Sequence, residues 1–534
     1  MFNLVDDAWV PVTYRDGHRA LVGLRQLMVD AEAINPQLDI PDASVARAIE
    51  RCLIAVVYQA TKPTVWAALW HKAWPAHEII TYLDRWRDRF DLDRFGQYQI
   101  ASAAKAPYSG LDRLLLEGSS ISRTPSAVSA AEAAQGLLGR LLWDPSGIRT
   151  GLAGDPMSNG GRSMPIGPAY LAMVPTCIVH LDTLARTLIW NLPEPPESPS
   201  RVDTPLWEDD PTAPRRSWLA SEVGPGRVLV WPGRRIKLHH DGDVVDGVLL
   251  ANGDPLHPEG RLHEVEPHGL WRQPVVRTPK TGKVKTTRRR TGKPTPVRQN
   301  KVSWRTPGQL EPVWGAALDL GGPRPIGIHR LLNPPIVDAP SQARLITIAA
   351  LLGTHSSTID DIIHRDLLVT TRDLADRIHT IGLLNGFIIR MTELQVEARI
   401  YGKTQPDPQQ IVKIREEITT QEQHADVVEE TITSHLAGHE LDLTPLHHHV
   451  MAAATKMEDL IHRQKIRHTL TSTTTWGTSG NALPNTLYKT WKTLQDQFTD
   501  LMILPNNHPE RRVAKLGQAL TGGNRQKPPR PSEE

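Results

Sequence analysis

The sequence contains very little cysteine: Cys52 and Cys177 are the only two among its 534 residues. Two cysteines so far apart cannot form the framework of several disulfides that stabilises small secreted domains. They also cannot build an all-cysteine zinc site within this chain, because such a site needs four thiolates. A disulfide-rich secreted fold and a zinc-ribbon fold are therefore both excluded.

Long apolar runs are missing as well. No stretch approaches the roughly 20 apolar residues that a membrane-spanning helix needs. The start, MFNLVDDAWVPV, has two early acids and no basic stretch before an apolar one, so it does not resemble a signal peptide. Hydrophobic residues make up 39% of the chain and charged residues 22%, which is enough apolar material for packed cores. We therefore expect a globular, cytoplasmic protein that makes no membrane contact.

The length and the hydrophobic pattern predict an α+β fold with two domains. A chain of 534 residues exceeds the roughly 250 to 300 residues that one core supports. Strand-like and helical segments alternate at first, whereas only helical segments follow. We expect a large, irregular mixed α/β domain over residues 1–365 and a C-terminal four-helix bundle over residues 366–520. Residues 521–534 are expected to form a disordered tail.

Several segments carry clear secondary-structure signals. Apolar residues spaced four apart predict a helix in SVARAIERCLIAVVYQATK, with Ser44 as its cap. Helices are also predicted in SAVSAAEAAQGLLGRLLWD, which Pro145 ends, and in LDTLARTLIWNL. Strands are predicted in NLVDDAWVPVTY, RVLVWPG and DVVDGVLLANGD.

A block of positive charge interrupts the middle of a chain whose net charge is only +2. The stretch KTGKVKTTRRRTGKPTPVRQNK contains no acid, and the surrounding loop over residues 272–305 contains none either. Two interpretations stay open: a solvated loop kept extended by charge repulsion, or a loop that contacts the phosphate backbone of a nucleic acid. The candidate phosphate-binding residues are Lys280, Lys283, Lys285, Arg288, Arg289, Arg290, Lys293, Arg298 and Lys301.

The segment SGIRTGLAGDPMSNGGRSMPIGP, residues 146–168, is rich in glycine and proline. Both residue types interrupt helices and strands, so we expect one long loop without regular structure. Loops longer than about 12 to 15 residues within a compact domain usually have a function or are disordered. The segment is therefore a candidate functional loop.

No segment carries a complete catalytic motif. GIRTGLAGD lacks the lysine of a phosphate-binding P-loop, and the HRD triplet at residues 364–366 lacks the other parts of a kinase motif. The alternative from the enzyme class is a metal-dependent nuclease or phosphohydrolase that uses His239, His240 and Asp241. The competing interpretation of these residues is a polar β-turn at Asp241 and Gly242.

The opening residues FNLVDDAWVPV, followed by GLRQLM, resemble the start of the CasA family, the large subunit of the type I-E CRISPR surveillance complex Cascade. The similarity continues through AEAAQGLLGRLLWDPSG, LDTLARTLIWNL, HGLWR and LLGTHSSTIDDIIHRDLL, so it covers most of the chain in order. The N-terminal match is carried by Asn3, Leu4, Asp6, Trp9, Val10 and Pro11.

This resemblance implies a non-catalytic, antiviral DNA-binding subunit. Its expected partners are the other Cascade subunits, the CRISPR RNA, double-stranded target DNA with a protospacer-adjacent motif (PAM), and a helicase-nuclease that it recruits. Because base pairing with the guide RNA reads the target sequence, such a subunit needs only a short PAM reader and a wedge that opens the duplex for R-loop formation. The resemblance implies no cofactor. Family members with cysteine pairs near HGLWR can bind zinc, but this chain lacks those pairs, so no metal is predicted.

The same resemblance assigns candidate site residues. A Gly-rich loop can press its backbone into the narrow minor groove, which makes Asn159, Gly160, Gly161 and Arg162 the candidate PAM reader. The competing interpretation is a simple connecting loop.

The position of the family's duplex wedge is occupied here by His355, Ser356, Ser357 and Thr358, without the family's glutamine. Two of these residues precede an acid by three positions, which also predicts the capped start of a helix. The cation nearest to the place of the family's lysine finger is Arg261.

Overall fold

The computed structural model describes most of the first 378 residues and short pieces of the remainder. The described ranges are 2–62, 66–95, 127–151, 155, 158–159, 161–196, 201–210, 213–241, 244–259, 261–272, 295–296, 323–333, 340–378, 430–431, 433–439 and 442. The chain divides into two compact units: unit 1 comprises Met1–Asn300 and Ala316–Thr371, and unit 2 comprises Lys301–Gly315 and Arg372–Glu534. Within the described ranges, no helix is both long enough and apolar enough to cross a bilayer.

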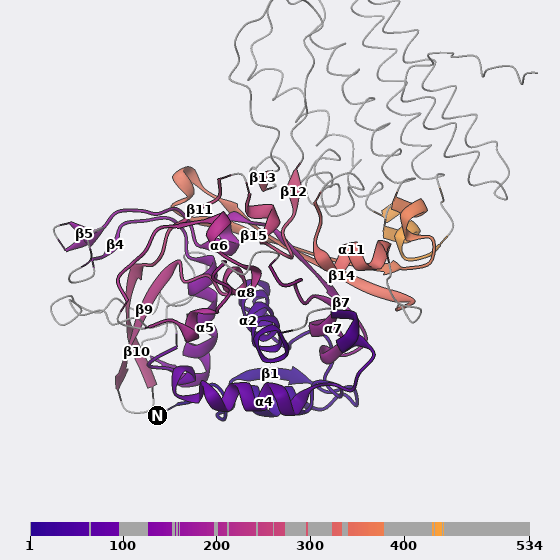
Figure 1. The fold of residues 1–534 in the computed structure, drawn as a ribbon, viewed down its shortest axis with the longest axis horizontal. Coiled ribbons are helices and arrows are strands. Elements are labelled where there is room, and N and C mark those ends of the chain that lie inside the picture. The colour runs from indigo at the N-terminus through magenta and orange to yellow at the C-terminus, as the bar shows by residue number, and fades with distance from the viewer. Residues whose placement is uncertain are drawn as a thin grey trace, which may run out of the picture. The chain divides into compact units, whose positions relative to one another are not determined.

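Helix α2 (Ala43–Thr61) forms the centre of unit 1 (Figure 1). The helix is confirmed, but its cap is Asp42 and not Ser44: the Asp42 carboxylate accepts hydrogen bonds from the backbone N–H groups of Ser44 and Val45. The helix is buried around most of its circumference, which explains why apolar residues occur on all of its sides. Two buried arginines on it form ion pairs, Arg47 with Glu50 and Arg51 with Glu266. It packs against α4 (Ala76–Arg85), α5 (Ala130–Trp143), α7 (Leu184–Trp190) and α8 (Pro225–Leu229).

Two further predicted helices are confirmed, and one predicted strand is wrong. Helix α5 begins with a capping box between Ser129 and Glu132 and ends before Asp144 and Pro145. Helix α7 begins at a Thr183 cap. The segment RVLVWPG, predicted as a strand, begins in α8, which contains its first three residues, because Pro225 at the first helical position favours a helix start.

A six-stranded sheet carries the Gly-rich segment. It is built on β10 (Val244–Asn252), a confirmed strand, which pairs with β9 (Arg234–Asp241) and β3 (Val128–Ser129). Beyond β10 follow β4 (Arg149–Thr150), β6 (Arg162–Ser163) and β5 (Ser158–Asn159). Residues 146–168 are therefore not free of regular structure as predicted, since three short strands extend the sheet through them.

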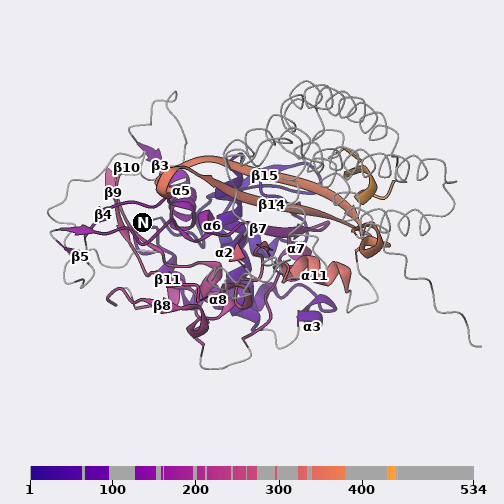
Figure 2. The same cartoon turned by 90° about the horizontal axis from the view of Figure 1, so that it is seen from above.

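A three-stranded antiparallel sheet lies beside α2. Its order is β15 (Ile359–Thr370), β14 (Gln342–Leu352) and β7 (Thr176–His180), and β14 and β15 form the long hairpin that Figure 2 shows from above. The helix start predicted after Thr358 is wrong: the β-branched residues that follow pair with β14 as a strand. Because β15 extends to Thr370, residues 366–370 belong to this sheet and not to the C-terminal domain.

The remaining elements are short. In the predicted four-helix bundle, residues 374–378, 430–431 and 433–436 are helical. Apart from residues 366–373, 437–439 and 442, the rest of that bundle and the tail over residues 521–534 lie outside the described residues. The other elements are β1 (Val10–Thr13), β2 (Arg19–Val22), α1 (Leu24–Val29), α3 (Trp66–Trp70), η1 (Arg87–Phe90), α6 (Tyr170–Met173), η4 (Leu206–Glu208), β8 (Trp218–Leu219), η5 (Ala220–Glu222), β11 (Leu256–His257), η6 (Leu262–Glu264), β12 (Trp271–Arg272), β13 (Thr295–Pro296), α11 (Ile326–Leu332) and η9 (Thr354–Ser356).

Candidate nucleic-acid interface

The Gly-rich segment forms a β-hairpin that ends in a two-residue turn. Strands β5 and β6 pair Asn159 with Arg162, so only Gly160 and Gly161 connect them. Gly161 has a φ of +73°, which glycine adopts without steric cost. Two-residue hairpin turns need such angles, and glycine pairs are therefore preferred in them. Gly160 and the side chain of Asn159 lie outside the described part of the structure.

The turn is hydrogen-bonded to Gly151 on one side and is open on the other. The backbone N–H of Gly151 donates to the carbonyl oxygen of Gly161 over 2.9 Å. A Cβ on Gly151 would lie 2.7 Å from the carbonyl carbon of Gly161, so only glycine permits this approach. By contrast, a Cβ on Gly161 would meet no heavy atom within 4 Å, and Arg162 is exposed. Gly161 and Arg162 are thus both open to the outside. Strands β4 and β5 lie at the left edge of unit 1 in Figure 1.

A buried ion pair holds the stem of this hairpin. The guanidinium of Arg215 donates to the Asp155 carboxylate over 2.6 Å and to the Ser163 hydroxyl over 2.9 Å. The Ser158 hydroxyl donates to the same carboxylate over 2.8 Å. Because Asp155 and Ser163 lie on either side of the turn, this network closes the two ends of the hairpin on one another.

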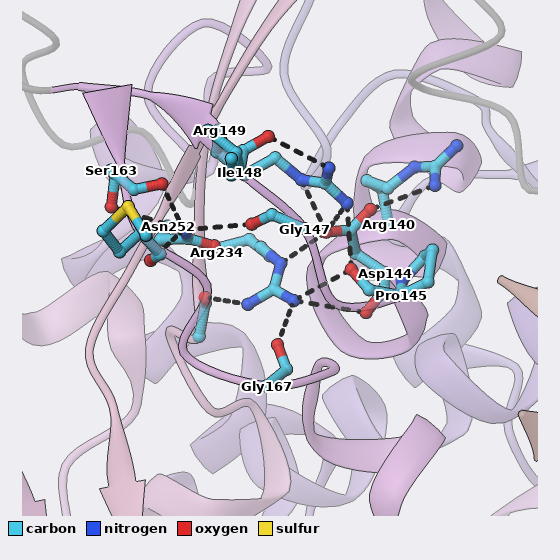
Figure 3. A network of polar contacts seen from close by, with 12 residues as sticks. Arg140, Asp144, Pro145, Gly147, Ile148, Arg149, Ser163, Gly167, Arg234 and Asn252 are labelled. Carbon is cyan, nitrogen blue, oxygen red and sulfur yellow. Dashed lines mark hydrogen bonds and ion pairs between the residues drawn. The ribbon is translucent and has the colours of Figure 1, made fainter. Parts of the chain in front are cut away.

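A second buried cluster is centred on Asp144, where α5 ends and the Gly-rich segment begins (Figure 3). Its carboxylate lies 2.5 Å from Arg234 Nε, 2.9 Å from an Arg149 nitrogen and 3.1 Å from an Arg140 nitrogen. Burial alone would raise the pKa of Asp144, but the charges of Arg234, Arg149 and Arg140 lower it below its usual range. Arg234 also donates to the Gly167 carbonyl oxygen over 2.8 Å, so one side chain ties both ends of the Gly-rich segment together.

The predicted wedge residues lie at the tip of the β14–β15 hairpin. His355 and Ser356 have φ angles of 56° and 57°, which are uncommon for residues other than glycine. His355, Ser357 and Thr358 are exposed. The carbonyl oxygen of Ser356 accepts a hydrogen bond of 2.8 Å from the backbone N–H of Ser146, two residues after Asp144. The structure therefore brings the predicted wedge next to the root of the predicted reader.

The other predicted DNA contacts are placed only in part. Arg261 precedes η6 and forms an exposed ion pair with Glu264 at 2.9 Å. Strands β12 and β13 pair Trp271 with Pro296 and Arg272 with Thr295 across the basic segment. The nine candidate phosphate-binding residues Lys280, Lys283, Lys285, Arg288, Arg289, Arg290, Lys293, Arg298 and Lys301 all lie outside the described residues.

The histidines of the enzymatic alternative do not converge. They are neighbours on β9, and successive side chains of a strand point to opposite faces. His239 Nδ1 lies 2.6 Å from an Asp246 oxygen, whereas His240 Nε2 lies 2.6 Å from an Asp93 oxygen. Across the described ranges, no three histidine, cysteine or acidic side chains gather as metal ligands would. The geometry does not favour a metal centre on this strand.

The sequence patterns did not reveal the buried charged residues that support the candidate reader hairpin. Asp144, Arg234, Arg215 and Asp155 are each 9% exposed or less, although buried charges are uncommon in proteins. The partners Asp144 and Arg234 are 90 positions apart, so no local spacing connects them. The only local signal was the stop of α5 at Asp144 and Pro145.

Solved structures with the same fold cover nearly all of this chain. Thermobifida fusca Cse1 is similar with a TM-score of 0.63 and 21% identity over 98% of this chain and 99% of its own. A CasA from Thermus thermophilus is similar with a TM-score of 0.63 and 19% identity over 93% and 99%. A chain of a CRISPR RNA-guided surveillance complex is similar with a TM-score of 0.57 and 16% identity over 85% and 99%. No curated protein matches the sequence.

The family assignment covers most of the sequence. Residues 3–457 match the family described as CRISPR-associated protein Cse1. The names CasA and Cse1 denote the same protein in Thermus thermophilus, so the resemblance to the CasA family is confirmed. The chain belongs to the family of the CRISPR-associated protein Cse1.

Proposed function

We propose that this chain is the non-catalytic large subunit of a type I-E Cascade complex and recognises the PAM in double-stranded target DNA. In this role it helps to open the duplex so that the CRISPR RNA can invade, and it recruits the helicase-nuclease that degrades the target. Membership of the Cse1 family and the similarity to a chain of an RNA-guided surveillance complex support the assembly with other Cascade subunits.

The Gly160–Gly161 turn is the observation that carries the proposed PAM contact. A turn without side chains can enter the minor groove, which is only about 6 Å wide. Its neighbour Arg162 is exposed and offers a guanidinium group to the groove edge or to a phosphate. The buried Asp155 and Asp144 clusters hold the stem of the hairpin in place before DNA binds. Binding therefore loses less free energy to ordering the turn.

The tip formed by His355, Ser356, Ser357 and Thr358 is proposed to lie against the duplex beside the PAM. Its hydrogen bond from Ser146 keeps it close to the reader hairpin. His355, Ser357 and Thr358 are exposed at the end of the β14–β15 hairpin, so the tip offers an imidazole and hydroxyl groups to the outside. Such groups can hydrogen-bond to phosphate or sugar oxygens and thereby position the DNA.

The basic segment is proposed to hold the phosphates of the duplex or of the displaced strand. It supplies attraction without base discrimination, because counterion release depends on the backbone and not on the sequence. Strands β12 and β13 tie this segment to unit 1, and Arg261 is a weaker candidate because Glu264 balances its charge.

The proposal is tested by reconstituting Cascade with and without this chain. Binding is measured on duplexes that share the protospacer and differ only in the PAM. We expect PAM-dependent binding and R-loop formation only when the chain is present, and no hydrolysis of DNA until the helicase-nuclease is added. Equal binding to all PAM variants would contradict the proposed function.

A further inference from the structure

Arg149 links the strand beside the reader hairpin, β5–β6, to the end of helix α5. It lies on β4, which pairs with β6. Two residues further along β4, the backbone N–H of Gly151 donates to the carbonyl oxygen of Gly161 in the turn. The Arg149 side chain is 9% exposed and runs back to Asp144 and Pro145, where the helix has ended (Figure 3). One residue therefore joins the neighbourhood of the turn to the root of the Gly-rich segment.

Two guanidinium groups hold the carbonyl group of Pro145. Arg149 donates to this oxygen over 2.9 Å and Arg234 donates over 3.3 Å, so the oxygen accepts two charge-assisted hydrogen bonds. The peptide group that follows is planar, so fixing the carbonyl of Pro145 also fixes the direction of the N–H of Ser146. Hydrogen bonds in a chain polarise one another, which strengthens the bond that this N–H donates. The two arginines therefore orient the Ser146 donor.

The Ser146 donor meets an uncommon backbone conformation at the tip of the β14–β15 hairpin. Its N–H donates over 2.8 Å to the carbonyl oxygen of Ser356. His355 and Ser356 have φ angles of 56° and 57°. Residues other than glycine rarely adopt such angles, and they persist where surrounding contacts hold them. The bond from Ser146 is such a contact, and it comes from outside the hairpin.

We propose that Arg149 is a positioning residue that sets the place of this tip relative to the candidate PAM reader. Because its side chain is buried, it acts through the Pro145–Ser146 peptide group and not by contacting DNA. Three arginines share the carboxylate of Asp144, so this carboxylate keeps two cationic partners when Arg149 is replaced. The inference rests on the proposed function, and it names the residue that keeps the PAM contact and the tip contact in register on the duplex.

The test compares Arg149→Met with the matched control Arg330→Met. Methionine is also long and unbranched, and it removes every hydrogen-bond donor. The Arg330 side chain is likewise buried, at 2% exposed, and it likewise donates to a backbone carbonyl, that of Trp190, and to a carboxylate, that of Glu194. It lies on α11, which both views place on the opposite side of unit 1 from β4 and β5 (Figure 1 and Figure 2). Thermal unfolding midpoints verify that the variants fold.

Hydrogen exchange of the full-length chain measures the order of the tip, and reconstituted Cascade measures its use. We expect faster exchange at residues 353–358 in Arg149→Met, because the donor to Ser356 is no longer oriented. Opening of a duplex beside a matched PAM, followed by 2-aminopurine fluorescence, should be about tenfold slower, the effect of losing one hydrogen bond to a charged group. The ratio of affinities for matched and mutated PAM should stay at the wild-type value, and Arg330→Met should behave as the wild type in all three measurements.

A double variant separates positioning from general stabilisation. Ser146→Pro removes the N–H that Arg149 orients, so Arg149→Met should cause no further loss of opening rate in the Ser146→Pro background. An additive loss would overturn the inference and leave the proposed function standing, as would unchanged exchange and opening rates in Arg149→Met. If Ser146→Pro does not fold, exchange at residues 353–358 in Arg149→Met relative to Arg330→Met decides alone.

Two further outcomes concern the PAM. A lost PAM preference in Arg149→Met would also overturn the inference, because the residue would then support the reader itself. A wild-type complex without PAM preference would overturn the proposed function and the inference together.

Discussion

The buried Asp144 cluster predicts a large and specific loss of stability when its one carboxylate is removed. Asp144→Asn keeps the shape of the side chain but removes the charge that faces Arg234, Arg149 and Arg140. Asp144 is fully buried, and the side chains of the three arginines are 9% exposed or less. Breaking a buried pair by removing one partner typically costs about 3 to 5 kcal/mol, because the opposite charge stays buried. We expect a loss of this size in the free energy of unfolding of unit 1.

The matched control is Asp182→Asn. Asp182 and Arg186 are four residues apart in the sequence, as are Arg140 and Asp144, but their side chains are 51% and 42% exposed. Solvent screens such a pair, so its loss should cost less than about 1 kcal/mol. The comparison therefore isolates the effect of burial at constant spacing.

Urea unfolding of the full-length chain measures both variants, and hydrogen exchange of residues 144–168 reports the local consequence. We expect faster exchange across the Gly-rich segment in Asp144→Asn, because Arg234 no longer fixes both of its ends. Since the native pKa of Asp144 is lowered, its contribution is complete above the unfolded value near 3.9 and disappears as the pH falls below it. The two variants should therefore differ strongly at pH 7. An Asp144→Asn protein as stable as Asp182→Asn would refute the structural role of the cluster.

Three further predictions follow from individual sites. Burial lowers the pKa of His268 to about 3, so below pH 6.5 the unfolded chain binds a proton that the native chain does not bind. The free energy of unfolding should therefore fall by up to roughly 4 to 5 kcal/mol between pH 6.5 and 3. Urea titrations of His268→Asn should show a smaller dependence of stability on pH. Replacing Arg288, Arg289 and Arg290 by glutamine should weaken binding to all duplexes alike and reduce the slope of log affinity against log salt by up to about 3; a loss confined to one PAM would contradict a backbone role. His240→Ala should leave DNA binding unchanged and the metal content of the purified protein unaltered, whereas stoichiometric metal lost with this variant, together with hydrolysis, would support the nuclease alternative.

Sequence patterns predicted the elements whose signals are local. Helix α2 has apolar residues along its whole length, and α5 has a capping box and a proline stop, so neither depends on distant residues for its recognition. RVLVWPG was mispredicted because the segment is short and ambiguous, and the residues after Thr358 were mispredicted because the spacing to Asp360 and Asp361 matches a capped helix start. Pairing with β14 makes the residues after Thr358 a strand, and local propensity alone does not predict this pairing.

The candidate site was also predictable only where its signal is local in the sequence. The glycine pair at residues 160–161 is visible in sequence, because two-residue turns demand glycine. What the sequence could not reveal is the support of that turn: Asp144 meets Arg234 across 90 positions, and Asp155 meets Arg215 across 60.

The central claim is that the Gly160–Gly161 turn reads the PAM, and one comparison tests it most directly. Gly161 and Gly17 have similar φ angles of +73° and +89°, and a Cβ on either would meet no heavy atom within 4 Å. Gly17 follows Tyr14 in the turn between β1 and β2, away from the proposed interface. Asparagine tolerates this backbone conformation, so Gly161→Asn and Gly17→Asn should change stability by similar, small amounts.

The measurement is the ratio of the affinities of reconstituted Cascade for duplexes with a matched and a mutated PAM. We expect Gly161→Asn to reduce this ratio by at least tenfold, because a side chain on the turn prevents its entry into the minor groove, while Gly17→Asn retains the wild-type ratio. An unchanged ratio in Gly161→Asn, or an equal loss in both variants, would contradict the assignment of PAM reading to this turn.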